Sequence, residues 1–122
     1  MTLLNDFFNV TGSEQGEKDA VIYHIRLNPT HAIFGAHFPG NPITPGVCQI
    51  GIVEELVSKQ IDKNVKVTGI SNIKYMSTLS PTEHETLDVQ ISSIKEQEGE
   101  YVSQCLLCCP ECVFTKMTIR LK

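Results

Sequence analysis

The sequence has none of the features that direct a chain to a membrane or to nucleic acid. No apolar run approaches the roughly 18 residues that are needed to span a bilayer. The first residues, MTLLNDFFNV, lack the basic region and the small-residue cleavage site of a secretory signal. Lysine and arginine form no cluster, and the formal net charge is −4, so the main source of affinity for phosphates is missing. We therefore expect a cytoplasmic protein that binds neither a membrane nor nucleic acid.

The chain also lacks internal repeats, linkers and low-complexity tracts. Its 122 residues are enough for one domain with a substantial core and too few for two. A hydrophobic share of 41% and a charged share of 20% are ordinary for a globular protein and argue against intrinsic disorder. We predict a single domain over residues 1–122.

Cysteine is present in an odd number, five, and four of the five lie between Cys105 and Cys112. This spacing does not resemble a secreted disulfide scaffold, so we expect reduced thiols. The pattern C-x-x-C-C-x-x-C suggests a zinc site on paper. However, Cys105 and Cys108 are expected on opposite faces of a strand, and free cysteine packs as a small hydrophobe. We therefore predict no metal site; Cys109 and Cys112 flank a turn, where a disulfide formed on oxidation would be incidental.

Hydrophobic periodicity predicts one long helix and several strands. From residue 46 to about residue 60 the apolar residues have helical spacing, and the early half has almost no polar face, as in a buried helix. Pro45 suits the start of this helix, because a missing N–H is harmless there. Alternating patterns predict strands at residues 20–27, 65–79, 86–94, 101–108 and 113–121. We expect turns at residues 12–18 and 96–100, a short helical turn at 31–34, and a short strand or helix at 3–10.

The most unusual stretch is HFPGNPITPGV, residues 37–47, which runs directly into the predicted helix. Proline fixes φ, and glycine permits backbone angles that are closed to other residues, so this run builds a stiff turn that aims side chains. One buried helix followed by long strands predicts an α+β architecture, with an antiparallel sheet wrapped around the helix. The stiff turn at the start of that helix is the candidate functional site.

This motif, with Phe34 three residues ahead of His37, resembles the signature of the β-hydroxyacyl-acyl carrier protein dehydratases of the hot-dog fold, the FabA/FabZ type. The resemblance implies an α+β hot-dog fold, with one long central helix wrapped by an antiparallel sheet, and a homodimer or a higher assembly of dimers. It implies a lyase of fatty-acid or related acyl-chain metabolism that removes water from a 3-hydroxyacyl thioester. The substrate is then carried on the phosphopantetheine of an acyl carrier protein, and no cofactor of the enzyme itself is implied.

The resemblance also implies roles for individual residues. His37 takes the position of the base that removes the proton next to the thioester carbonyl, and histidine suits this role because its unperturbed pKa is about 6.5. Gly46 and Val47 offer backbone N–H groups and the positive end of the helix dipole to the developing enolate oxygen. Phe38 and Gln49 are further predicted substrate contacts. Gln49 either orients a water or the substrate, or is a buried amide satisfied by the backbone.

One position departs from the family pattern. The family places a carboxylate, contributed by the opposite subunit, fourteen residues after the histidine, and here that position is Gly51. Glycine inside a helix costs roughly 1 kcal/mol relative to alanine, so it needs a reason such as close packing or room for a ligand. Glu55, on the same helical face, and Glu54 are predicted substitutes, because helical side chains lean toward the N-terminus. The alternative is that both are solvated surface charges.

The remaining histidines are interpreted as structural or exposed. We expect His31 to cap or pack near the turn, and His24 to be a satisfied histidine in a strand with apolar neighbours. His84 lies between two glutamates after a turn and is expected to be exposed. None of the three is predicted to act in catalysis.

Three functions are open at this point. The first is a 3-hydroxyacyl-thioester dehydratase. The second is a subunit that binds acyl chains or an acyl carrier protein and is paired with an active homologue, which supplies the missing carboxylate. The third is a hot-dog thioesterase. Such enzymes also typically carry a carboxylate or similar group on the central helix, so Gly51 argues against a thioesterase as much as against a dehydratase. Lys74 matches a basic position of the dehydratases and is a predicted contact for the acidic carrier protein.

Overall fold

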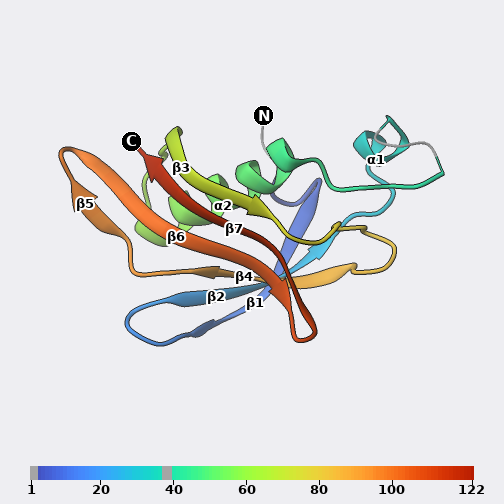
Figure 1. Cartoon of the computed structure of the whole chain (residues 1–122), viewed down its shortest axis with the longest axis horizontal. Helices are drawn as coiled ribbons and strands as arrows, with labels where there is room; N and C mark the ends of the chain where they lie inside the picture. The colour runs from blue at the N-terminus through green and yellow to red at the C-terminus, as the bar shows by residue number, and fades with distance from the viewer. Residues whose placement is uncertain (1–2, 37–39) are drawn as a thin grey trace.

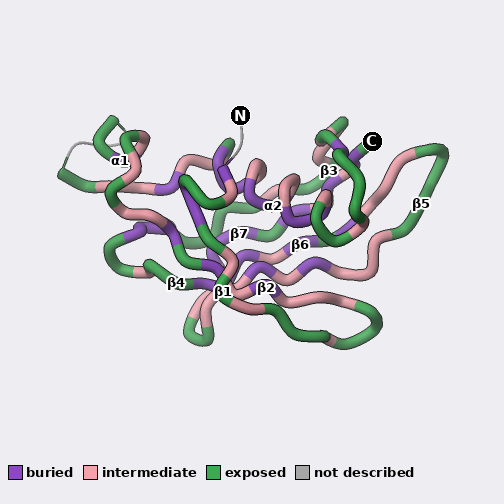
Figure 2. Tube along the Cα trace, turned by 180° about the vertical axis from the view of Figure 1, so that it is seen from behind, coloured by how far each residue is buried: buried purple, intermediate pink, exposed green. Residues whose placement is uncertain are grey.

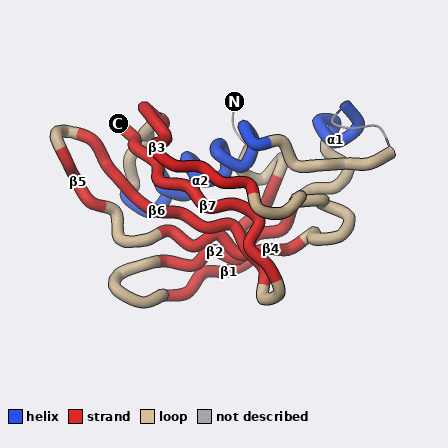
Figure 3. Tube along the Cα trace, in the orientation of Figure 1, coloured by secondary structure: helices blue, strands red, loops and turns tan. Residues whose placement is uncertain are grey.

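A computed structural model describes residues 3–36 and 40–122, and within them the long helix α2 (Gly46–Ile61) lies against a seven-stranded sheet (Figure 1). The short helix α1 (Ala32–Ala36) precedes α2 in the chain. The strands are β1 (Phe8–Gln15), β2 (Val21–Leu27), β3 (Val67–Tyr75), β4 (Thr86–Ile91), β5 (Lys95–Gln97), β6 (Glu100–Cys109) and β7 (Cys112–Leu121). The predicted α+β architecture, one long helix against an antiparallel sheet, is confirmed (Figure 3).

The sheet has the order β1-β2-β4-β6-β7-β3, and β5 pairs with β6 outside this path. All of these pairings are antiparallel. Register shifts interrupt the β1–β2, β3–β7 and β6–β7 pairings, and such bulges bend strands and increase their twist. The strand order makes β1 and β3 the two edges of the sheet. The sheet is strongly twisted and wraps α2 (Figure 1).

The core lies between α2 and the sheet face that it covers (Figure 2). Alternate residues of β2 are buried, as the period of two predicts. On α2 the buried residues recur at helical spacing and include two polar or sulfur-containing side chains at the start of the helix; they are Cys48, Gln49, Ile52, Val53, Leu56 and Val57. The apolar side chains among them join those of the strands in one hydrophobic cluster, which fixes the helix on the sheet.

The ends of α2 follow from local backbone chemistry. Pro45 is the N-cap residue, with φ −60° and ψ 147°, so it stands one position before the helix. The helix ends at Ile61 because Asp62 adopts a left-handed conformation, with φ 55°, and its N–H bonds back to the last turn. The predicted span from residue 46 to about residue 60 is confirmed. In the described ranges, no helix has the length and apolarity needed to cross a membrane.

Several predicted boundaries were wrong at polar edge segments. The predicted turn at residues 12–18 contains the end of β1, because Glu14 and Gln15 pair with β2 despite their polarity. The predicted turn at 96–100 overlaps the end of β5 and the first residue of β6, and the turn itself is formed by Glu98 and Gly99, both at positive φ. The strand predicted at 65–79 ends at Tyr75, and that at 86–94 ends at Ile91.

Candidate functional site

Two backbone N–H groups at the N-terminus of α2 have no acceptor among the described residues. The N–H groups of Cys48 and Gln49 bond to the carbonyl of Pro45 at 3.0 and 3.1 Å. Among the residues that the structure describes, no acceptor is found for the N–H groups of Gly46 and Val47, and no side chain caps the helix. Free N–H groups and the positive end of the helix dipole favour an oxygen that carries negative charge. This end of α2 is therefore suited to polarise a carbonyl group.

A cavity of about 340 Å³ adjoins this helix start, between residues 43–49 and the segment 75–79 that follows β3. Thr44 lines it and is 2% exposed, and its hydroxyl has no hydrogen-bond partner among the described residues. A buried hydroxyl without a partner costs about 1–3 kcal/mol. The hydroxyl is thus available to a polar group that enters the cavity.

Gln49 is a buried amide that holds the helix start in place. Its Nε2 donates to the carbonyl of Thr44 at 3.2 Å, and its Oε1 accepts from the hydroxyl of Thr115 on β7. The backbone-satisfied amide that we considered for this position is what the structure shows, although Gln49 also lines the cavity. Its contacts join α2, the preceding loop and β7 into one rigid wall.

Tyr75, the last residue of β3, lies over Gly46. A Cβ at Gly46 would come within 2.8 Å of the Tyr75 Cζ and still nearer to its hydroxyl oxygen, so this close approach requires glycine. A tyrosine hydroxyl is protonated at neutral pH, and burial raises the pKa of Tyr75 further, so this hydroxyl can donate a hydrogen bond. Neither Tyr75 nor Thr44 was among the predicted site residues. Thr44 belongs to the stiff turn but was not singled out there, whereas Tyr75 reaches the helix start through the packing of β3, for which there is no local sequence signal.

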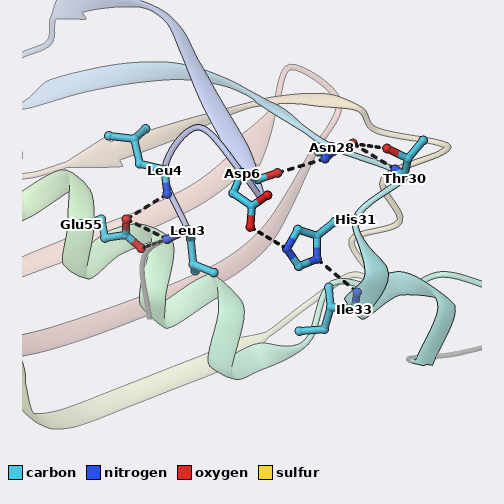
Figure 4. Close-up of polar contacts among 8 residues, drawn as sticks. All are labelled: Leu3, Leu4, Asp6, Asn28, Thr30, His31, Ile33 and Glu55. Atoms are coloured by element: carbon cyan, nitrogen blue, oxygen red, sulfur yellow. Dashed lines mark hydrogen bonds and ion pairs between the residues drawn. The ribbon is translucent and has the colours of Figure 1, made fainter.

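Glu55 anchors the N-terminal segment of the chain to α2 (Figure 4). The N–H of Leu3 donates to both carboxylate oxygens, at 3.0 and 2.8 Å, and the N–H of Leu4 donates to Oε1 at 2.9 Å. The carboxylate that we predicted as a substitute acid therefore binds backbone groups of its own chain.

Close packing explains the glycine at position 51. A Cβ there would lie 2.8 Å from Cδ1 of Leu3, the residue whose N–H is held by Glu55. The space above Gly51, where the resemblance places a carboxylate, is thus filled by an apolar side chain from the N-terminal segment. Of the two explanations considered for this glycine, packing is the one that the structure supports.

Glu54 also makes structural contacts. Its Oε2 accepts from the N–H of Val67 at 2.8 Å, and its Oε1 lies 3.9 Å from the ammonium group of Lys66. These contacts tie the start of β3 to α2. His37 and Phe38, the predicted base and a predicted substrate contact, lie outside the described residues.

His31 caps α1, as predicted. Its Nδ1 accepts from the N–H of Ile33 at 3.1 Å, and its Nε2 lies 3.2 Å from Oδ2 of Asp6 (Figure 4). The ring also packs edge-on against Phe7, with 5.3 Å between ring centroids. The histidine therefore connects the N-terminal segment to the chain that leads into the stiff turn.

The other two histidines also make defined contacts. His24 is satisfied, as predicted, but by carboxylates: Nδ1 lies 2.6 Å from Asp88 and Nε2 lies 3.1 Å from Glu14. These carboxylates raise the pKa of His24. The prediction that His84 is exposed was wrong, because it is half-buried against Phe114, with 4.9 Å between ring centroids.

The clustered cysteines are free thiols. Cys105 belongs to the core, whereas Sγ of Cys108 accepts from Nε2 of Gln90 at 3.7 Å outside the core cluster, so the two face opposite sides of β6 as predicted. In the part of the chain that the structure covers, no three His, Cys, Asp or Glu side chains are arranged to hold a metal ion. Cys109 and Cys112 lie side by side at the end of the β6–β7 hairpin.

The sequence is similar to a family of dehydratases and to several of their members. A family model described as ApeI-like, ApeI dehydratase, matches residues 13–106. The 3-hydroxyacyl-[acyl-carrier-protein] dehydratase FabZ of Thermomicrobium roseum is 31% identical over 93 residues, which cover 70% of this chain and 61% of the relative. The FabZ of Caldicellulosiruptor saccharolyticus is 27% identical over 113 residues, which cover 83% of this chain and 79% of the relative. The match to the first relative thus spans less than two thirds of its length.

Solved structures show the same fold. The dehydratase heterocomplex ApeI:P of Xenorhabdus doucetiae aligns with a TM-score of 0.71 at 24% identity, covering 92% of this chain and 95% of that chain. YhdA of Lactococcus lactis, a proposed thioesterase, aligns with a TM-score of 0.64 at 8% identity, covering 95% and 92%. At these identities the likeness establishes the fold alone, and the predicted hot-dog fold is confirmed.

Proposed function

The chain belongs to the ApeI-like dehydratase family, and from this premise we propose that it is a dehydratase-like protein acting on 3-hydroxyacyl thioesters of an acyl carrier protein. The relatives that bear the name 3-hydroxyacyl-[acyl-carrier-protein] dehydratase support this substrate class. The observation that carries the proposal is the start of α2, where no described residue accepts from the N–H groups of Gly46 and Val47 and where Gly46 lines a cavity. The setting is fatty-acid or related acyl-chain metabolism, and the acyl group arrives on phosphopantetheine without a cofactor of the enzyme.

The proposed chemistry assigns each group one task. Removal of water breaks the C2–H and C3–O bonds of the substrate, and negative charge develops on the thioester oxygen as the C2 proton leaves. His37 is the proposed base. The N–H groups of Gly46 and Val47, with the nearby hydroxyl of Tyr75, stabilise the oxygen at the helix start. The leaving hydroxyl group at C3 needs a proton from an acid.

The source of that acid separates two candidate functions. Glu55 and Glu54 both accept hydrogen bonds from backbone N–H groups, and Leu3 covers Gly51. These contacts favour, as a second candidate, an acyl-binding subunit whose partner chain contributes the carboxylate. The solved relative from Xenorhabdus doucetiae is described as a heterocomplex. A thioesterase function has support from fold similarity alone.

A second hot-dog chain is part of the proposal in either case. Val47, Tyr75 and Met76 are large apolar residues that are 74%, 53% and 54% exposed, and Tyr75 and Met76 line the cavity. They lie where α2 begins and where the edge strand β3 ends. A homodimer, a higher assembly of dimers or a heterodimer would cover this apolar surface.

Carrier-protein binding is assigned to the outer face of β3 and β7. Lys74 and Lys116 are directly paired across these strands, and no ion pair is found for either one within the described residues. Like charges in this position repel each other, and an acidic partner surface relieves the repulsion. This agrees with the role that the sequence predicts for Lys74.

Hydration of crotonyl and longer enoyl thioesters, the reverse reaction, tests the proposal through the loss of enoyl absorbance. We expect the purified wild-type protein to hydrate the thioester and the His37→Ala variant to lose roughly 10²-fold or more of the rate. An inactive wild-type protein whose thioester binding is unaffected by His37→Ala would exclude the homo-oligomeric enzyme. Activity that appears on addition of a carboxylate-bearing homologue would then identify the second candidate.

A further inference from the structure

The β6–β7 hairpin holds two thiols in contact at its end. Cys109 and Cys112 are directly paired across the strands, and Pro110 and Glu111 form the turn between them. Their sulfur atoms are 3.1 Å apart, and both residues are half-buried, so a small reagent can reach them. The dehydratase chemistry proposed above uses neither thiol.

The direct pairing of Cys109 with Cys112 suits a disulfide. Directly opposite residues in an antiparallel pair have Cα atoms about 4.5–5.5 Å apart, which is inside the range of about 4.4–6.8 Å found in disulfides. A sulfur–sulfur bond is about 2.05 Å long, so bond formation moves the two sulfur atoms of Cys109 and Cys112 together by only about 1 Å. Pro110 restricts the turn through its fixed φ. Closure therefore requires little rearrangement of the hairpin.

We propose that Cys109 and Cys112 form a redox-active dithiol, which a small-molecule disulfide oxidises to a cross-strand disulfide linking β6 to β7. The thiolate of one cysteine attacks a sulfur of the reagent R–S–S–R, a mixed disulfide forms, and one R–S⁻ leaves and takes up a proton. The second cysteine attacks its neighbour's sulfur in the mixed disulfide, and a second R–SH leaves. The two cysteines together lose two electrons and two protons, and the reagent is reduced to two thiols.

Proximity makes the second step selective. Because the neighbouring thiol is already in contact, attack on the mixed disulfide is intramolecular, with a high effective concentration. The other three cysteines do not compete, since Cys48, Cys105 and Cys108 are all buried.

Oxidation at the hairpin acts next to the candidate site. Two residues beyond Cys112, the carbonyl of Phe114 accepts from the N–H groups of Met76 and Ser77, at 2.7 and 3.3 Å. Both Met76 and Ser77 line the cavity beside α2. The disulfide therefore fixes the start of β7, on which one wall of the cavity depends.

Incubation of the purified full chain with oxidised glutathione tests the dithiol. We expect the thiol count in denaturant to fall from five to three, and the protein mass to fall by two hydrogen atoms with no glutathione adduct. Peptide mapping should place the bond between Cys109 and Cys112, and the thermal midpoint should rise by several degrees.

Single substitutions provide the decisive controls. Cys109→Ser and Cys112→Ser each remove one partner, so the remaining thiol should keep a stable glutathione adduct; Cys109→Ala and Cys112→Ala repeat the test if a serine variant unfolds. The Cys108→Ala variant should form the Cys109–Cys112 disulfide as the wild type does. An unchanged count of five thiols, or a bond mapped to Cys108, would overturn the proposal. This outcome is independent of whether the protein is a dehydratase.

Discussion

At the scale of single residues, the two glycines of α2 make room for different neighbours. Gly46 leaves room for the Tyr75 hydroxyl and Gly51 leaves room for Leu3. The first glycine lies at the open helix start, where it lets a hydroxyl stand beside two free N–H groups. Gly51 lies where the resemblance places an acid, and its lack of a side chain lets the apolar side chain of Leu3 pack against the helix at this position. The same residue type thus serves the proposed carbonyl site in one case and packing in the other.

The proposed role of the Val47 N–H is testable because proline is tolerated in the first turn of a helix. Val47→Pro removes this donor, and Val47→Ala keeps it. In the assembly that hydrates enoyl thioesters, we expect Val47→Pro to lower kcat by roughly 10²-fold, as loss of an oxyanion donor does, and Val47→Ala to leave it unchanged. A Val47→Pro variant with an intact helix by circular dichroism and a wild-type rate would remove Val47 from the site.

His24 gives stability a pH dependence. The hydrogen bond to Asp88, followed by that to Glu14, raises the pKa of His24 in the folded protein. A group with a raised folded pKa contributes stability that is complete below its unfolded pKa of about 6.5 and is lost as the pH rises through the folded pKa. The thermal midpoint of the wild type should therefore fall above about pH 6.5 relative to that of His24→Gln. Parallel profiles for the two proteins would contradict this account, and Asp88→Asn should flatten the wild-type profile in the same way.

At the scale of elements, the local sequence was enough to predict α2. The polar strands form only because they pair with neighbouring strands. The helix is specified by its own residues, since Pro45 precedes it and its apolar side chains repeat at helical spacing. The end of β1 and the whole of β5 consist of polar residues that become strands because a neighbouring strand supplies hydrogen bonds. The site divides in the same way: Gly46 and Val47 follow from the motif, whereas Tyr75 and Leu3 reach α2 only through the fold.

The N-terminal segment, residues 3–7, is held by buried side chains and by the carboxylate of Glu55. Glu55→Ala removes the acceptor of the Leu3 and Leu4 N–H groups, and hydrogen bonds to a charged group contribute about 1.5–3 kcal/mol. We expect a loss of about 2 kcal/mol in the free energy of unfolding, with faster hydrogen exchange at Leu3 and Leu4. Lys59→Ala, an exposed change on the same helix, should have little effect. Equal stability of the two variants would show that the segment is held by packing alone.

At the scale of the whole molecule, the partner chain in the assembly decides whether the site receives the acid that this chain lacks. The apolar residues beside the cavity face outward at the edge strand β3, so a partner chain that covers them also borders the proposed carbonyl site. In the dehydratases that the motif resembles, base and acid come from opposite subunits. A partner with a carboxylate at the position of Gly51 would complete a site with this chain, whereas a second copy of this chain brings only Leu3 over Gly51.

Restoring the carboxylate within this chain distinguishes the two candidate functions. Leu3→Ala opens the space above Gly51, and Gly51→Glu places an acid there, so the double variant carries the group that the family position lacks. If the absent acid limits the homo-oligomer, the double variant should hydrate enoyl thioesters at least ten times faster than the wild type, which corresponds to about 1.4 kcal/mol in the activation barrier. The matched variant Leu3→Ala/Gly51→Gln, with the same size and no acid, should stay at the wild-type rate. An equal gain in both variants would show that opening the space, rather than the acid, changes the rate.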